Sequence, residues 1–361
     1  MVHQLAATVS CELPSTHKEA LNMRINRISK PSRMTSVIAT LSATALVLAG
    51  CSSESGDDAA GDNAGGEGAS ESYSIGINQL VQHPALDASA AGFKAAFEDA
   101  GVEVEWDEQN ANGEQSTAVT IAQQMANADH DLYLAIATPA AQAMAQSIKD
   151  APLLFTAVTD PEAAELVDSN DAPGANVTGT SDIAPISDQV DLLKELVPDA
   201  KTIGVVYASG EVNSQVQVDE LTSVAGDSDI DVKSQTVTSV TEIPQAVQAL
   251  GDVDAIYVPT DNMVVSGIAS LINVANEKQI PVIGAEAGTV EGGAAATLGI
   301  DYEQLGRQTG EMALRILQDG EEPASTPVES AKEFTYVVNP EAAEAQGIEI
   351  PEAILEEAEA V

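Results

Sequence analysis

The chain has 361 residues, of which 44% are hydrophobic and only 3% aromatic, and its formal net charge is −43. This length is enough for two domains with sizeable cores. Because the acidic residues are spread along the whole chain, we expect no binding to nucleic acid or to anionic membrane surfaces, and we interpret the charge as a means of solubility, for instance in a salty medium.

The N-terminal segment has the features of a bacterial lipoprotein signal. Four basic residues between positions 24 and 33 precede an apolar stretch, residues 37–49, that is too short to span a membrane. The stretch runs into Leu48-Ala49-Gly50-Cys51, which resembles the lipobox, where the cysteine receives a diacylglycerol and becomes the new N-terminus. We therefore expect a signal peptide over residues 1–50, a lipid on Cys51, and anchoring on the extracytoplasmic face of the cell membrane.

Residues 1–22 fit no part of this signal, so Met23 is an alternative start of translation. An ordinary signal peptide with a chance cysteine is the alternative interpretation of the segment. Residues 52–72 contain no large apolar side chain and cannot offset the entropy of ordering, which indicates a flexible linker. The other cysteine, Cys11, would leave with the leader, so the mature domain is expected to fold without a disulfide.

From residue 73 onward, strand patterns and helix patterns alternate in two consecutive series. The first series has strands at 73–81, 102–106, 131–137 and 151–158, and helices at 85–101, 113–128, 138–150 and from 159. The second has helices at 186–199, 213–227, 240–250 and 260–279, and strands at 201–207, 230–237, 253–259 and 280–286. This alternation predicts the α/β class, with two Rossmann-like lobes whose parallel sheets are covered on both faces.

Polar residues follow five of these strands. In open parallel sheets, ligands bind beyond the carboxyl ends of the strands, and with two lobes those ends can face each other across a cleft. Each such residue alone is as readily a helix cap, but together they predict a ligand site. The candidates are Gln79, His83, Thr138, Pro139, Ala140, Thr159, Asp160, Glu211, Asn213, Ser214, Asp261 and Asn262.

Several motifs resemble one family of binding proteins. The segments "IGINQLVQHPALDAS", "AIATPAAQAMA", "FTAVTDP", "GVVYASGEVNS", "YVPTDNMVVS" and "LGIDYEQLGRQTGEMALRIL" are similar to those of the tryptophan/tyrosine (TrpX-like) substrate-binding proteins of ABC transporters, from about residue 74 to residue 355. The resemblance implies a type I periplasmic-binding-protein fold, with residues 73–182 and 287–322 in lobe 1 and residues 183–286 and 323–361 in lobe 2. Three crossovers would join the lobes, near Asp182, near Ala285-Glu286 and near Glu322-Pro323.

The same resemblance implies a monomer that carries a small solute, often an aromatic amino acid, to permease and ATPase subunits in the membrane, without a cofactor or a metal. A zwitterionic solute needs donors for its carboxylate, which the amides at 138–141 can supply. It also needs an acceptor for its ammonium, for which Asp261, Asp160 and Glu211 are candidates. Aromatic residues near strand ends can form an apolar wall, and Arg307 is expected to pair with a neighbouring helix. These aromatic residues are Phe155, Tyr207, Tyr257 and Tyr302.

Three alternatives remain. The same fold can bind a sugar, a nucleoside or a branched-chain amino acid instead. An extracytoplasmic enzyme has little support, because the mature chain holds two histidines, His83 and His130, and lacks the HExxH, GxSxG, P-loop and GxGxxG motifs. A transcription regulator of this fold would need a DNA-binding headpiece, whose place is taken by the lipobox and the acidic linker.

Overall fold

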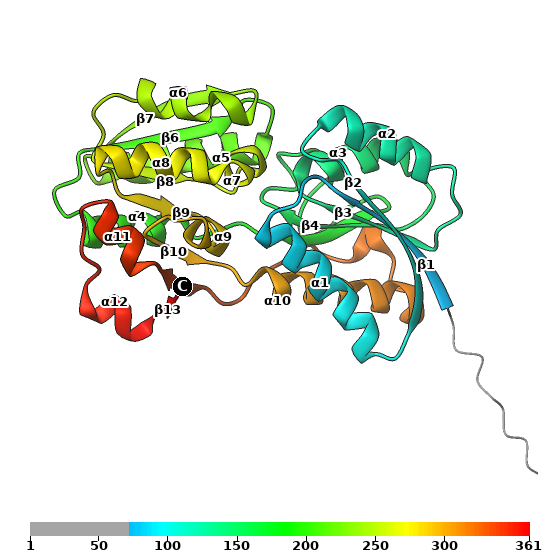
Figure 1. Cartoon of the computed structure of the whole chain (residues 1–361). Helices are drawn as coiled ribbons and strands as arrows, with labels where there is room; N and C mark the ends of the chain where they lie inside the picture. The colour runs from blue at the N-terminus through cyan, green and yellow to red at the C-terminus, as the bar shows by residue number, and fades with distance from the viewer. Residues whose placement is uncertain (1–71) are drawn as a thin grey trace, which may run out of the picture. The chain divides into compact units, whose positions relative to one another are not determined.

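The computed structural model describes residues 72–361, which form two α/β lobes (Figure 1). The predicted signal peptide, Cys51 and the linker up to residue 71 lie outside the described residues. Within residues 72–361, no helix combines the length and the apolar character that crossing a membrane requires.

The first lobe contains a six-stranded sheet in which all strand pairs are parallel. Its central strands β3 and β4 are buried at every residue, as expected for strands between two layers of helices. In spatial order the strands are β11 (Glu329–Ser330), β5 (Val177–Ser181), β4 (Leu153–Val158), β3 (Leu132–Ile136), β1 (Ser72–Gln79) and β2 (Glu103–Asn110). The helices of this lobe are α1 (Pro84–Asp99), α2 (Gln115–Met125), α3 (Thr138–Ser147) and α10 (Tyr302–Leu314). Helix α10 continues into a π-helical turn over Arg315–Asp319, and the 3₁₀ turn Pro323–Ser325 follows it.

The second lobe contains a seven-stranded sheet. Successive side chains of β6 alternate between its faces, so Val205 and Tyr207 belong to one buried cluster and Val206 to another. In spatial order the strands are β13 (Glu359–Ala360), β12 (Thr335–Val338), β10 (Ala296–Gly299), β9 (Val282–Gly284), β8 (Ala255–Val258), β6 (Thr202–Ala208) and β7 (Asp231–Val237), and the pair β10–β12 is antiparallel. The helices are α4 (Ile186–Leu196), α5 (Val212–Asp227), α6 (Ile243–Ala249) after the 3₁₀ turn Val240–Glu242, α7 (Asn262–Ser266), α8 (Ile268–Lys278), α9 (Ala287–Glu291), α11 (Pro340–Ala345) and α12 (Glu352–Glu357).

The chain crosses between the two sheets three times, which confirms the predicted fold class. The first crossing lies between β5 and α4. The second was expected near Ala285-Glu286, and this position is wrong, because β10 pairs with β9 and β12 in the second sheet. The third was expected near Glu322-Pro323, and it lies between β11 and β12 instead, because β11 still pairs with β5.

Two expected helices differ from the structure. The segment from residue 159 forms a turn rather than a helix: Asp160 Oδ1 accepts from the N–H groups of Glu162 and Ala163, but Glu165 then adopts a φ of 58°. This left-handed conformation stops the helix. The helix expected over 260–279 is divided at Gly267 into α7 and α8.

Helices α1 and α10 run side by side in the same direction, and glycines let them approach closely (Figure 1). A Cβ on Gly306 would lie 2.0 Å from the Ser89 carbonyl oxygen, and one on Gly310 would lie 2.6 Å from the Phe93 carbonyl oxygen. Only glycine fits at such contacts. Because α10 directly follows the second crossover, this packing holds the first turns of both helices at the boundary between the lobes.

Candidate functional site

A small cavity of about 10 Å³ lies between the lobes. It combines residues of lobe 1, residues of lobe 2, and residues next to two crossovers. Its apolar part is formed by Ala85, Leu86, Ala157 and Val265. Its polar part is formed by His83, Asp182, Thr260, Asp261, Asn262, Glu286 and Tyr302. No lysine or arginine is among these lining residues.

Four direct hydrogen bonds among residues 72–361 join the lobes around this cavity. Gln217 Nε2 of α5 donates to Thr159 Oγ1 at 3.2 Å. Thr159 Oγ1 lies 3.1 Å from Thr260 Oγ1, and His83 Nε2 lies 3.4 Å from Asn262 Oδ1. Farther out, Gln115 Nε2 donates to the Gly210 carbonyl oxygen at 2.9 Å. The described conformation therefore has the two lobes in contact through polar groups.

Asp261, predicted to meet the solute ammonium, has its carboxylate occupied by protein donors. Oδ1 accepts from the Val264 N–H at 2.8 Å and so caps α7, while Oδ2 accepts from the Ala208 N–H and Ser214 Oγ, both at 2.6 Å. Asp261 is fully buried, and burial raises its pKa. The predicted residue Ser214 thus serves Asp261, and together they connect β6, α5 and α7.

Glu211 binds the first residues of the same helix, α7. Its Oε2 accepts from both the backbone and the side-chain N–H of Asn262, at 3.0 and 2.6 Å, and from Asn213 Nδ2 at 3.2 Å. Its Oε1 accepts from the Met263 N–H at 3.1 Å. Burial, and then the charge of the neighbouring Asp261, raise the pKa of Glu211 to about 8.

Asp182 lies directly after β5, at the first crossover, and accepts a hydrogen bond from the first residue of α10. Tyr302 Oη donates to its Oδ2 at 2.7 Å, and Thr159 Oγ1 donates to its Oδ1 at 2.9 Å. Burial raises the pKa of Asp182. Since Asp182 and Tyr302 each adjoin a crossover and both line the cavity, the cavity wall is connected to the hinge.

Three polar cavity residues, Asp182, Thr260 and Glu286, were not among the predicted candidates. Glu286 had been assigned to a crossover. It is 2% exposed, its Oε2 accepts from the Gly288 N–H at 2.8 Å, and its Oε1 has no partner among residues 72–361. Burial, together with the charges of Glu291 and Asp182, raises its pKa to about 7. The missed signal was its position at the carboxyl end of the strand predicted over 280–286, because position at a strand end is the rule that selected the other candidates.

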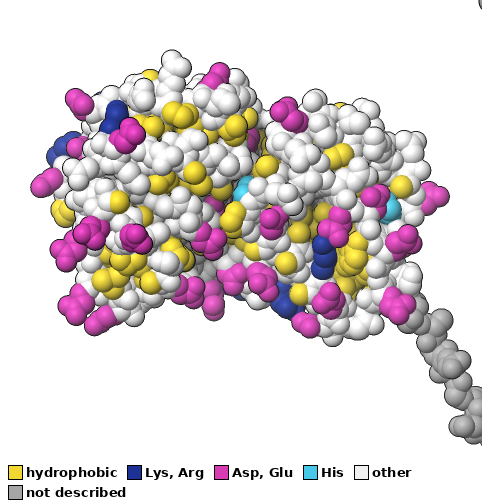
Figure 2. Space-filling view, viewed as in Figure 1, with side chains coloured by type: hydrophobic (Ala, Val, Ile, Leu, Met, Phe, Trp, Pro, Cys, Tyr) yellow, Lys and Arg dark blue, Asp and Glu magenta, His cyan; other side chains and the backbone are white. Residues whose placement is uncertain are grey.

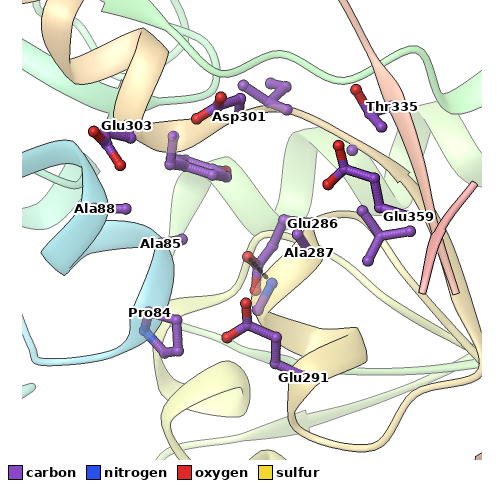
Figure 3. A pocket seen from close by; sticks show the side chains of 15 residues that line it. Pro84, Ala85, Ala88, Glu286, Ala287, Glu291, Asp301, Glu303, Thr335 and Glu359 are labelled. Carbon is purple, nitrogen blue, oxygen red and sulfur yellow. Dashed lines mark hydrogen bonds between the residues drawn. The ribbon is translucent and has the colours of Figure 1, made fainter. Parts of the chain in front are cut away.

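Glu286 also lines a second, wider pocket of about 310 Å³, on the side of the second and third crossovers. Figure 3 shows Glu286 and Glu291 there, with Pro84 and Ala85 of α1 across from them. The remaining acidic side chains of this pocket belong to Asp301, Glu303 and Glu359. Glu286 thus lies between the interlobe cavity and an opening toward the surface.

The structure places His83, Asp261, Asn262 and Tyr302 at the interlobe cavity. Thr138 and Ala140 are buried at the start of α3, and Pro139 lines a separate hollow of about 350 Å³ together with Glu211. The remaining candidates act within the protein. Gln79 Nε2 donates to Asp87 of α1 and Asp160 caps a turn, while Asn213 donates to Glu211.

Of the four predicted aromatic wall residues, only Tyr302 lines the cavity. Phe155 and Tyr257 are fully buried in the cores of their lobes, where Tyr257 Oη donates to Gln189 Oε1 at 2.6 Å. Tyr207 Oη donates to Gln215. Arg307 of α10 pairs with Asp99 of α1, as expected for a helix-pairing residue.

Comparisons with known proteins agree with this architecture. Residues 74–361 match the family model described as "ABC transporter substrate binding protein". A curated relative, the tyrosine-binding protein of Clostridioides difficile, is 42% identical over 298 residues, which are 81% of this chain and 86% of that protein. A solved domain from Streptococcus pneumonia in complex with L-Trp is 38% identical with a TM-score of 0.78, and the match covers 81% of this chain and all of that one.

A third relative is the ligand-free, open structure of a substrate-binding protein with adhesive properties from Clostridium difficile, which is 44% identical, over 80% of this chain and 99% of that one. Its TM-score is only 0.63, although its sequence is the more similar. By TM-score, the conformation described here is closer to that of the L-Trp complex than to that of the open structure. From its family match and its relatives, the chain belongs to the substrate-binding proteins of ABC transporters.

Proposed function

We propose that this protein captures an aromatic amino acid between its lobes and delivers it to the permease of an ABC importer. The observation that carries the proposal is the interlobe cavity, which holds buried carboxylates but no lysine or arginine side chain and therefore favours a ligand with an ammonium group. The names of two relatives, a tyrosine-binding protein and a domain in complex with L-Trp, support an aromatic side chain.

A thermal-shift screen of the full-length chain tests this proposal. The panel contains the standard amino acids, with sugars and nucleosides as the alternative solutes of the same fold. A ligand that binds only the folded state raises the unfolding midpoint by mass action, so L-tyrosine or L-tryptophan should give the largest shift. A shift with a sugar or a nucleoside, and none with any amino acid, would replace the proposed solute.

The anchor is the second part of the proposal. The basic region, the apolar stretch and the sequence Leu48-Ala49-Gly50-Cys51 support a lipid on Cys51. We expect Cys51→Ala to leave the binding domain folded but to abolish lipid attachment, measured by metabolic labelling with a fatty acid and by membrane fractionation. Cys11→Ala is the matched control and should be labelled like the parent; equal labelling of the Cys51 variant would refute the anchor.

A further inference from the structure

The first turn of α1 opens onto the interlobe cavity. Ala85 and Leu86 line the cavity, and the N-cap residue His83 makes no side-chain capping bond. The backbone N–H groups of Ala85 and Leu86 have no hydrogen-bond partner among the described residues. Free N–H groups at the start of a 16-residue helix, with the positive end of its dipole, favour an anion.

The other helices that begin at the cavity are already capped by carboxylates of the protein. Asp261 caps α7, Glu286 accepts from the Gly288 N–H of α9, and Asp301 accepts from the Gln304 N–H of α10. Glu211 occupies the N–H groups of Asn262 and Met263 as well. Among the helix starts that line this cavity in the described part of the chain, α1 is left for an external carboxylate.

The free oxygen of Glu286 lies close to this helix start. An ideal Cβ on Gly288 would be 3.2 Å from the free oxygen, Glu286 Oε1, and 3.4 Å from Pro84 Cβ, so the starts of α9 and α1 are neighbours across the lobes. Figure 3 shows the same arrangement. The side chain of Glu286 is nearly fully buried, and its Oε1 has no partner within residues 72–361, which is a costly arrangement unless a donor fills the place.

We infer that the head group of the amino acid binds between Glu286 and the first turn of α1. Glu286 Oε1 accepts from the ammonium, and the N–H groups of Ala85 and Leu86 donate to the carboxylate. An α-amino acid carries both charges on one carbon, so the groups that hold them must be neighbours, as these are. The inference rests on the proposed function and assigns the solute class: an α-amino acid recognised through its head group.

The ammonium half is tested by calorimetric titration of the full-length chain with three probes. These are L-tyrosine, tyramine, which lacks the carboxylate, and 3-(4-hydroxyphenyl)propanoate, which lacks the ammonium. Glu286→Gln removes one charge and keeps the shape of the side chain. It should lower the affinity for L-tyrosine and for tyramine about a hundredfold or more, and it should not lower the affinity for the propanoate. The control Glu277→Gln, at an exposed position of α8, should bind all three probes like the parent.

The inferred contact between the ligand carboxylate and the first turn of α1 is tested with a variant that blocks the backbone N–H donors there. His83→Asp places an acidic N-cap on α1, whose oxygen competes for the N–H groups of Ala85 and Leu86 and stabilises the helix. This variant should lose most of the parent's preference for L-tyrosine over tyramine. His83→Ala removes the same ring without adding a cap, so it should keep that preference. An unchanged preference in His83→Asp would overturn the role of α1.

The outcomes separate this inference from the proposed function. If the parent protein binds neither L-tyrosine nor L-tryptophan, the proposed function fails and the inference with it. If the parent binds L-tyrosine and Glu286→Gln binds it equally well, the inference alone fails. Far-ultraviolet circular dichroism and the unfolding midpoint of each variant establish that a loss of affinity is not a loss of fold.

Discussion

Four buried carboxylates near the cleft differ in what the protein supplies to them. Asp261 accepts three hydrogen bonds and Glu211 four, whereas Asp182 accepts two from hydroxyl groups and Glu286 accepts one. A carboxylate surrounded by protein donors is part of the framework. The one with an unused oxygen is the one that a ligand can satisfy.

Replacement of Asp261 should therefore affect the fold. Asp261→Ala leaves the Ala208 and Val264 N–H groups and the Ser214 hydroxyl buried without their acceptor. We expect a loss of about 3 kcal/mol or more in the free energy of unfolding, measured by urea denaturation. Asp252→Ala, at an exposed position, should change stability by less than about 0.5 kcal/mol. Equal urea midpoints for Asp261→Ala and Asp252→Ala would show that the Asp261 carboxylate does not stabilise the fold.

Glu286 should make stability depend on pH. Its pKa is raised to about 7 by burial and by the charges of Glu291 and Asp182, whereas burial lowers the pKa of His83 to about 4 and keeps that ring neutral. A raised carboxyl pKa contributes stability that is present below the ordinary pKa and is lost as pH rises through about 7.

The free energy of unfolding of the ligand-free chain should therefore fall between about pH 5 and about pH 8, and fall less in Glu286→Gln. Urea denaturation at each pH measures both slopes. An ammonium ligand favours the ionised carboxylate, so L-tyrosine should bind more tightly as pH rises through the same range. Parallel stability profiles for the parent and Glu286→Gln would contradict this prediction.

The pair α1–α10 decides how the elements around the cavity are arranged. It brings residues more than two hundred positions apart in the sequence, such as Arg307 and Asp99, into contact. The contact requires glycine at Gly306, where an added Cβ would meet a backbone oxygen of α1 at 2.0 Å. Helix packing of this kind allows little adjustment, because neither backbone can move without the sheet beneath it.

Gly306→Ala should consequently destabilise lobe 1 by at least about 2 kcal/mol, in spite of the better helix propensity of alanine. Gly226→Ala is the matched control. Gly226 lies in α5 with nothing within 4 Å of an added Cβ, so the same substitution there should stabilise by roughly 0.5–1 kcal/mol. Urea midpoints of the two variants that shift in the same direction would argue against close packing at Gly306.

Local sequence patterns predicted most elements, because each strand and helix carries its own periodicity. The predicted positions of the crossovers after β10 and β11 were wrong, because these two strands are too short to carry a periodicity of their own. β10 has four residues and β11 two, and their membership is decided by distant partners, Ile283 and Thr335–Val338 for β10 and Thr180 and Ser181 for β11. The strand-end rule found Asp261 and His83, but it could not tell an occupied carboxylate from a free one, since that depends on donors from other elements.

At the scale of the whole molecule, the acidity dominates. Figure 2 shows Asp and Glu side chains distributed over the visible face of both lobes, with few Lys and Arg among them. Like charges repel within a compact structure, and dissolved salt screens that repulsion. The lobes approach each other against this repulsion when they form the interlobe hydrogen bonds.

The unfolding midpoint should therefore rise with salt. An increase from about 0.01 M to about 1 M NaCl shortens the Debye length from about 30 Å to about 3 Å. Scanning calorimetry of the full-length chain measures the shift. Near pH 4, where many carboxylates are neutral, the same salt change should produce a smaller shift. A midpoint that is insensitive to salt at neutral pH would show that the charge of −43 costs the fold little.

The three crossovers also affect the order in which the protein can fold during synthesis. Lobe 1 lacks α10 and its edge strand β11 until residue 330 has been made, and lobe 2 lacks β12 and β13 until the last residues are present. Lobe 1 therefore cannot complete its sheet before residue 330 has been made, and lobe 2 cannot complete its sheet before residue 360. Until then, each unfinished sheet exposes a strand edge that its last strands later cover.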